Sequence, residues 1–225
     1  MAVLFCPNVI DMQQIFLDNV APGFLQAEQY AASEIWNKKI HFEKGDNVQI
    51  VAPSGTGKTS LIHFIYGLRK DYTGTIELDK LKLSGFDVEQ LASMRQTAIS
   101  VVFQDLRLFL QHSVKENILV KSRLGSAKNI PCMEEMCDLL GIASKLEQTC
   151  GTCSYGEQQR VAIIRALQQP FDFILLDEPF SHLDEKNRMK AMSLIEQCAI
   201  ANNAAIIFAD LKPIEFFKAT HTYFL

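Results

Sequence analysis

Residues 52–59 form a glycine-rich segment whose composition suits the binding of phosphate groups. The segment reads Ala-Pro-Ser-Gly-Thr-Gly-Lys-Thr and matches the phosphate-loop pattern G-x-x-x-x-G-K-[S/T], except that Ala52 occupies the first glycine position. Gly55 and Gly57 would let backbone N–H groups turn inward around phosphate oxygens. Because Ala52 adds only one methyl group at the end of a strand, we expect the loop to tolerate it.

Two side chains at the end of this segment would act on the bound phosphates. Lys58 would reach the β- and γ-phosphates as a flexible cation, and the Thr59 hydroxyl would ligate Mg²⁺. The candidate phosphate-binding residues are Ser54, Gly55, Thr56, Gly57, Lys58, Thr59 and Ser60. The alternative is a glycine-rich turn with a solvent-exposed lysine, but the strand and helix patterns that flank the segment favour phosphate binding.

Two adjacent carboxylates follow an apolar run later in the chain. Residues 173–176 are Phe-Ile-Leu-Leu, and Asp177 and Glu178 come next. Side chains at the carboxyl end of a buried parallel strand lie where α/β proteins bind their ligands. Asp177 would hold Mg²⁺, directly or through water, and Glu178 would polarise an attacking water as general base. Alone, the pattern also fits an ordinary strand end; beside a phosphate loop, it predicts a hydrolytic site.

The elements that must position these residues alternate along the chain. Residues 47–52 form a β-branched strand that enters the phosphate loop, and a helix is expected over residues 57–68. Further buried strands are expected at residues 98–103, 173–177, 204–208 and 222–225. Strands that alternate with helices in this way predict an α/β fold with a mostly parallel sheet.

The segment before the phosphate loop predicts antiparallel pairing. Residues 36–43 alternate weakly, with Ile40 and Phe42 on one side, and Lys-Gly-Asp-Asn at residues 44–47 then supplies a turn. We therefore expect an antiparallel hairpin that opens the core.

A helical lobe is expected within the core. Residues 106–168 show helical patterns, at 114–124, 132–142 and 156–168, and no convincing strand. No repeat or flexible linker divides the chain. Residues 1–225 are therefore predicted to form a single domain, with an α/β core from residues 1–105 and 169–225 and the helical lobe inserted between them.

Composition narrows the class of protein. The chain has 225 residues and a formal net charge of −4, which gives no basic surface for nucleic acid. It contains no apolar run of about 18 residues, and its first ten residues lack the basic lead of a signal peptide. We therefore expect a globular protein in the cytoplasm that does not bind nucleic acid.

Six cysteines, Cys6, Cys132, Cys137, Cys150, Cys153 and Cys198, are scattered through the chain. Cys150 and Cys153 have the spacing of a redox pair or half a zinc site, but no second Cys or His pair lies near them in the sequence. Their distribution favours reduced thiols over a disulfide framework.

Four further segments, in order along the chain, resemble motifs of the ABC ATPase family, and the resemblance covers nearly the whole length. Phe103-Gln104 is similar to the Q-loop, and residues 113–117 to the segment that follows it in the import and lipoprotein-release branches. Residues 153–160, Cys-Ser-Tyr-Gly-Glu-Gln-Gln-Arg, resemble the signature LSGGEQQR, and residues 181–184 resemble the D-loop. The nearest branch looks like the ATPases of lipoprotein-release, macrolide-efflux and cell-division systems.

The resemblance implies a P-loop ATPase core with an N-terminal antiparallel β subdomain and an inserted helical subdomain. It implies ATP and Mg²⁺ as ligands, with Gln104 contacting the magnesium ion and the water. It also implies a dimer, homo- or heteromeric, in which Ser154, Gly156 and Glu157 of one subunit face the nucleotide held by the other. Integral membrane permease subunits would be the remaining partners, which would place the chain at the inner face of the cell membrane.

An aromatic side chain before the phosphate loop would stack on adenine in this family. Phe24 lies at the family's spacing from Lys58, and Tyr30 and Trp36 are alternatives. Each of the three could instead be a core residue.

Three residues depart from the family pattern. Tyr155 replaces a signature glycine and would crowd the γ-phosphate unless its ring points away, and Cys153 replaces a leucine. Ala209 stands where the family has a histidine that contacts the γ-phosphate and orients the water, so hydrolysis is expected to be slow. His221 comes too late in the chain to replace that histidine, and we expect it to lead into the last strand.

These observations support two hypotheses. The first is an ATPase subunit, with Lys58, Gln104 and Glu178 as its catalytic residues, that couples dimer closure to a membrane permease. The second is an ATP-gated dimerising subunit that hydrolyses ATP weakly beside a more active ATPase, and Tyr155 and Ala209 motivate it. A soluble ABC protein that acts on nucleic acid is disfavoured by the acidic charge.

Overall fold

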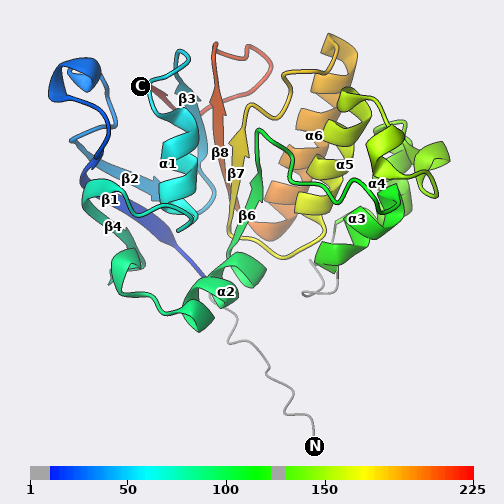
Figure 1. The fold of residues 1–225 in the computed structure, drawn as a ribbon, viewed down its shortest axis with the longest axis horizontal. Coiled ribbons are helices and arrows are strands. Elements are labelled where there is room, and N and C mark those ends of the chain that lie inside the picture. The colour runs from blue at the N-terminus through cyan, green and yellow to red at the C-terminus, as the bar shows by residue number, and fades with distance from the viewer. Residues whose placement is uncertain (1–10, 123–129) are drawn as a thin grey trace, which may run out of the picture.

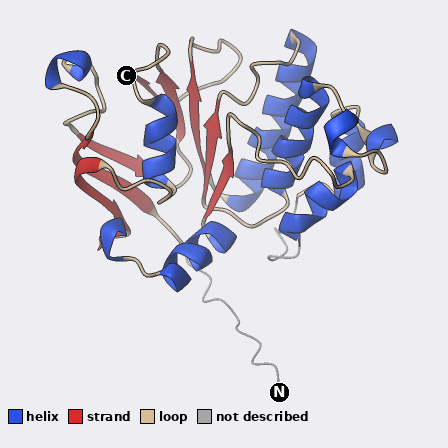
Figure 2. Ribbon diagram, viewed as in Figure 1, coloured by secondary structure: helices blue, strands red, loops and turns tan. Residues whose placement is uncertain are grey.

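Two β-sheets and a group of helices make up the computed structural model, which describes residues 11–122 and 130–225 (Figures 1 and 2). The larger sheet has the strand order β6-β7-β8-β3-β9, and its neighbouring strands pair in parallel. Its strands are β3 (Asn47–Val51), β6 (Ile99–Val102), β7 (Phe173–Asp177), β8 (Ala205–Asp210) and β9 (His221–Phe224). The predicted parallel sheet is therefore confirmed, and His221 begins its last strand as expected.

The smaller sheet is antiparallel and has the order β2-β1-β4-β5. Its strands are β1 (Gln14–Pro22), β2 (Lys39–Glu43), β4 (Tyr72–Leu78) and β5 (Leu81–Lys82). The expected hairpin of residues 36–43 with the following strand is wrong, because β2 pairs with β1 whereas β3 pairs with β8 and β9. The physical reason is burial: β3 is apolar and enclosed, so it takes an inner position in the parallel sheet.

Helices cover the parallel sheet and extend beyond one end of it (Figure 1). They are α1 (Lys58–Ile65), α2 (Val88–Thr97), α3 (Val114–Ser122), α4 (Met133–Leu139), α5 (Tyr155–Leu167) and α6 (Glu185–Asn202). Short 3₁₀ helices span Ala27–Tyr30, Leu83–Gly85, Ala143–Lys145 and Cys150–Thr152. Helices α3, α4 and α5 confirm the helical patterns expected between residues 106 and 168, apart from residues 123–124, which lie outside the described residues. None of the described helices is long and apolar enough to cross a membrane.

Alternation along the central strands explains where the core and the site lie. On β7, Ile174 and Leu176 pack into a core shared with α5 and α6, while Phe173 and Leu175 face a second core shared with α1 and the antiparallel sheet. Because side chains alternate along a strand, Asp177 should face the same side as Phe173 and Leu175. That is the side of the sheet against which α1 packs.

Strands β1 and β4 of the antiparallel sheet approach each other closely at a glycine. Gly74 has φ of +80°, and a Cβ atom there would lie 2.3 Å from the backbone oxygen of Asn19 on β1. β1 is irregular at this point, because its register with β4 shifts between Asp18 and Ala21. The two strands can approach this closely only where no side chain intervenes.

We expect Gly74→Ala to lower the free energy of unfolding by roughly 2–4 kcal/mol, because the added methyl group would have to displace the backbone of β1. Gly85→Ala is the matched control, since a Cβ atom at Gly85 would meet open space and its φ is not in the left-handed region. Urea denaturation followed by circular dichroism measures both. Equal midpoints for Gly74→Ala and the parent protein would contradict this account of the β1–β4 contact.

Candidate functional site

The phosphate loop lies between β3 and α1, and its two glycines hold conformations that other residues rarely adopt. Gly55 has φ of 86° and Gly57 has φ of 96°. A Cβ atom on Gly57 would also lie 3.1 Å from the Trp36 ring. Trp36 is buried and its ring N–H donates to the backbone oxygen of Thr56 at 3.0 Å. The ring of Trp36 therefore supports the loop from behind.

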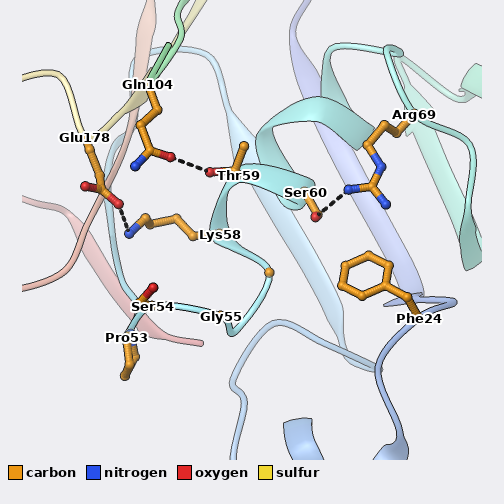
Figure 3. A pocket seen from close by; sticks show the side chains of 11 residues that line it. Phe24, Pro53, Ser54, Gly55, Lys58, Thr59, Ser60, Arg69, Gln104 and Glu178 are labelled. Carbon is orange, nitrogen blue, oxygen red and sulfur yellow. Dashed lines mark hydrogen bonds and ion pairs between the residues drawn. The ribbon is translucent and has the colours of Figure 1, made fainter.

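A cavity of about 360 Å³ opens over the loop (Figure 3). It is lined by Phe24, Pro53, Ser54, Gly55, Gly57, Lys58, Thr59, Ser60, Arg69, Gln104 and Glu178. Most of the residues predicted to bind phosphate thus meet at one place. Thr56 is the exception in the loop, because it does not line the cavity and its carbonyl is held by Trp36. Ala52 is fully buried, and its N–H donates to the Asp210 carbonyl at 3.0 Å.

Lys58 and Glu178, which both line this cavity, form an ion pair that is largely buried. Their charged atoms are 2.5 Å apart, and the side chains are 5% and 12% exposed. Lys58 is therefore not solvent-exposed, as the alternative of an ordinary glycine-rich turn would have it. Glu178 has φ of 46°, an unusual value for a residue other than glycine, and its N–H donates to the Ala209 carbonyl at 2.9 Å. Residues held in such conformations cluster at functional sites.

Asp177 presents a carboxylate that has been removed from water without receiving a hydrogen bond. The residue is fully buried, and both of its carboxylate oxygens lack a hydrogen-bond partner among the described residues. Burial raises the pKa of Asp177 to about 6, and the nearby Thr59 hydroxyl and Lys58 ammonium offset only part of this rise. An unpaired buried carboxylate is costly, so these oxygens suit a cation ligand.

The neighbouring side chains fit a magnesium ion. The Thr59 hydroxyl lies 3.2 Å from the side-chain oxygen of Gln104, and Asp177 lies close enough to Thr59 for the hydroxyl to affect its pKa. Hydroxyl, amide and carboxylate oxygens are the ligands that Mg²⁺ prefers. Thr59, Gln104 and Asp177, the three predicted metal ligands, come from three separate elements and converge here.

The signature residues lie outside the cavity. Ser154 precedes α5, and its hydroxyl accepts the Glu157 N–H at 3.3 Å while the Glu157 carboxylate accepts the Ser154 N–H at 2.8 Å. This reciprocal capping begins the helix. Gly156 approaches the next loop so closely that a Cβ atom would lie 2.9 Å from the His182 carbonyl. Within this one chain, Ser154, Gly156 and Glu157 therefore organise a helix N-terminus and do not reach the phosphate loop.

Tyr155 turns toward its own chain. Its hydroxyl donates to the backbone oxygen of Gln104 at 3.2 Å, and its ring meets the His182 ring edge-on at 4.3 Å. The side chain thus bridges the loop of Gln104 and the loop after β7.

Ala209 lies within β8, opposite Asp177, and is buried. Its side chain supplies no group that could contact a phosphate or orient a water. The next residue, Asp210, has a carboxyl whose pKa is raised by burial and by the nearby charge of Glu178.

Phe24 is the aromatic side chain that lies in the phosphate cavity. Tyr30 and Trp36, its alternatives, line a different cavity behind the loop, together with Thr56 and Phe224. Phe24 is also 50% exposed, unlike the buried Trp36.

Arg69, which also lines the phosphate cavity, was not predicted. It lies 11 positions after Lys58 without a recognisable motif, and only the fold brings it beside Phe24.

We expect Asp177→Asn to stabilise the metal-free protein. A folded-state pKa near 6, above the ordinary 3.8, means that stability from this group is present below about pH 4 and is lost as pH rises through 6. At pH 7.5 the amide should therefore raise the free energy of unfolding by about 1–3 kcal/mol, and the gain should vanish near pH 4. Urea denaturation at both pH values measures this.

Asp138→Asn serves as the matched control, because Asp138 is exposed on α4, and we expect a change within about 0.5 kcal/mol. If Asp177→Asn is less stable than the parent protein at pH 7.5, the account of an unpaired carboxylate is wrong.

Comparison with known proteins places this site in a family. Residues 36–181 match the family described as ABC transporter. The chain is 33% identical over 159 residues to the lipoprotein-releasing system ATP-binding protein LolD of Buchnera aphidicola subsp. Schizaphis graminum, and covers 69% of each chain. It is 34% identical over 156 residues to an aliphatic sulfonates import ATP-binding protein, SsuB 2, of Burkholderia cenocepacia. That match covers 69% of this chain and 54% of the relative.

A solved structure shares the fold. The dimeric, post-hydrolysis state of the ATP-binding cassette MJ0796, bound to ADP and Pi, superimposes with a TM-score of 0.73 at 26% identity and covers 88% of both chains. The family match covers well over half of this chain and includes the phosphate loop, Gln104, Asp177 and Glu178. The chain therefore belongs to the ABC transporter family, as an ATP-binding subunit with the ABC ATPase fold.

Proposed function

We propose that this chain binds Mg-ATP in the cavity over the phosphate loop and hydrolyses it to ADP and phosphate. The observation that carries the proposal is the pair of largely buried charges that line the cavity, Lys58 with Glu178, beside the unpaired carboxylate of Asp177. Such charges are expensive to bury; a polyphosphate would pair with Lys58, and a divalent cation would pair with Asp177.

Binding would rearrange the ion pair. Lys58 would exchange its carboxylate partner for phosphate oxygens, and Glu178 would then be free to accept a proton from a water. Thr59, Asp177 and Gln104 would hold the magnesium ion, which when bound neutralises charge that develops on the phosphates. The backbone N–H groups around Gly55 and Gly57 would supply the remaining contacts.

A second subunit would complete the site. Ser154, Gly156 and Glu157 lie at an exposed helix N-terminus that does not reach the cavity of their own chain, so they suit a nucleotide held by another chain. The dimeric cassette MJ0796 supports this arrangement. The partner ATPase could be a second copy or a different chain.

The names of the relatives support a role beneath a membrane. They are described as ATP-binding proteins of lipoprotein-releasing and import systems. We therefore propose permease subunits as partners, a location at the inner face of the membrane, and a single domain in which residues 106–168 form the helical lobe. Dimer closure on ATP would move this lobe and, with it, the permease.

A second candidate function is an ATP-gated clamp with weak hydrolysis. Ala209 provides no side chain to orient the attacking water, and Tyr155 replaces the signature glycine. The loss of one such transition-state interaction reduces rates by about a hundredfold or more. In this case ATP would drive dimerisation while a partner ATPase performed most of the hydrolysis.

Glu178→Gln distinguishes the two functions. If Glu178 is the general base, steady-state phosphate release should fall by at least about a hundredfold while Mg-ATP binding, measured by calorimetry, is retained. Glu89→Gln, at an exposed position on α2, should behave as the parent protein does. Equal phosphate release from the parent and Glu178→Gln would reject the enzyme and leave the clamp.

Lys58→Ala tests the site itself. Removal of the ammonium group should leave Glu178 buried without a partner and should weaken Mg-ATP binding by at least about tenfold. Unaltered calorimetric titrations for Lys58→Ala, or no heat with the parent protein, would reject the phosphate loop as the binding site.

A further inference from the structure

The guanidinium group of Arg69 lies between two aromatic rings at the edge of the phosphate cavity. It is 4.9 Å from the centre of the Phe24 ring and 5.6 Å from the centre of the Phe64 ring. Phe64 is fully buried on α1, whereas Phe24 is 50% exposed. Figure 3 shows Arg69 next to Phe24, on the opposite side of Ser60 from the phosphate loop. The cation therefore connects an exposed ring to the core.

Polar contacts hold the guanidinium in this position. Its Nε donates to Asp71 Oδ1 at 2.9 Å, its Nη2 pairs with Asp71 Oδ2, and its Nη1 donates to the Ser60 hydroxyl at 3.0 Å. A planar guanidinium that meets a carboxylate with two bonds has a defined orientation. Arg69 therefore presents a fixed plane to Phe24.

The same segment also fixes the backbone that carries Phe24. The Gly23 N–H donates to the Asp71 carbonyl at 2.9 Å, and a Cβ atom on Gly23 would lie 3.2 Å from that oxygen. Asp71 thus holds both the Arg69 guanidinium and the backbone of the residue that precedes Phe24. Such an arrangement keeps an exposed aromatic side chain in one orientation, which lowers the entropy lost when a ligand stacks on it.

We infer that Arg69 is a positioning residue for the nucleotide base. It would hold the Phe24 ring in place from one side so that the base of the nucleotide can stack on the exposed side. The inference rests on the proposed function, and it assigns to the Arg69 guanidinium the orientation of the ring on which the base stacks. Phe24 and the phosphate loop line one cavity, so a nucleotide with its phosphates over Gly55 can reach the ring with its base.

Direct contact between Arg69 and the phosphates is the competing role. Arg69 lines the same cavity, but three of its N–H groups already bond to Asp71 and Ser60. Two of its five N–H groups remain, so any phosphate contact would have to be made from the orientation that Asp71 and Ser60 impose. The two roles differ in which ligands they affect, because only the positioning role depends on the base.

The test compares Mg-ATP with magnesium tripolyphosphate, which has no base. Calorimetry would measure both dissociation constants for the parent protein, Phe24→Ala, Arg69→Met and the double variant. We expect Arg69→Met to weaken Mg-ATP binding about fivefold to tenfold and to leave tripolyphosphate binding within about twofold. The double variant should bind Mg-ATP as weakly as Phe24→Ala does, because both substitutions act on the same interaction between the base and the Phe24 ring.

Two further variants make the outcome interpretable. Lys70→Met removes an exposed neighbouring cation and should leave both dissociation constants unaltered. Arg69→Lys keeps the charge without the planar contact to Phe24 and Asp71, so it should bind Mg-ATP more weakly than the parent but better than Arg69→Met. If Arg69→Met does not fold, Arg69→Lys provides the comparison with the parent protein for both ligands.

Equal weakening for both ligands, or additive effects in the double variant, would overturn the positioning role. Parent-like binding of Mg-ATP by Arg69→Met and Arg69→Lys would overturn it as well. These results differ from a failure of the proposed function, in which the parent protein itself would not bind Mg-ATP.

Discussion

The cost of burying charge at the carboxyl end of β7 governs this site. Asp177 is closed off from water, and neither of its oxygens has a hydrogen-bond partner in the part of the chain that the structure describes. Lys58 and Glu178 neutralise each other next to it. The packing of β7 between two apolar cores stabilises the fold enough to offset this cost. Because the strand is enclosed on both faces, its last residue cannot move toward solvent. A bound cation would satisfy the carboxylate of Asp177, and a bound anion would satisfy the ammonium group of Lys58. The site is therefore organised for a ligand, although its buried charges lower the stability of the protein without one.

The loops that surround the site are joined to one another through side chains of α5. Gln159 is buried and donates to the Glu178 carbonyl and the Ser181 hydroxyl, each at 3.2 Å. Arg165 donates to the carbonyls of Leu106 and Arg107, two successive residues with left-handed backbone conformations. A movement of α5 would therefore displace the loop after β6 and the loop after β7 together. Tyr155 adds a third link of this kind, so its replacement of glycine changes the connections within the chain.

Two of the departures from the family pattern have a physical feature in common. Ala52 and Ala209 are small residues at the ends of β3 and β8, and both are buried beside the carboxyl edge of the parallel sheet. Where the family pattern has a histidine, Ala209 leaves the edge of the sheet without a polar side chain. In the proposed mechanism, nucleotide binding would depend mainly on the loop backbone and Lys58, whereas the rate of hydrolysis would depend on polar side chains at such positions.

Local patterns in the sequence determined the phosphate loop, the parallel strands and the acidic strand end, because glycine spacing and apolar runs report short-range constraints. They also determined the family, through motifs that stand in order along the chain. The tertiary structure alone decided that β2 pairs with β1, that Glu178 pairs with Lys58 across 120 positions, and that the Arg69 guanidinium lies against the Phe24 ring. These contacts join segments that are distant in the sequence, and no motif in either segment predicts its partner. The free energy that selects them comes from packing the two sheets around α1, and no single segment contains that information.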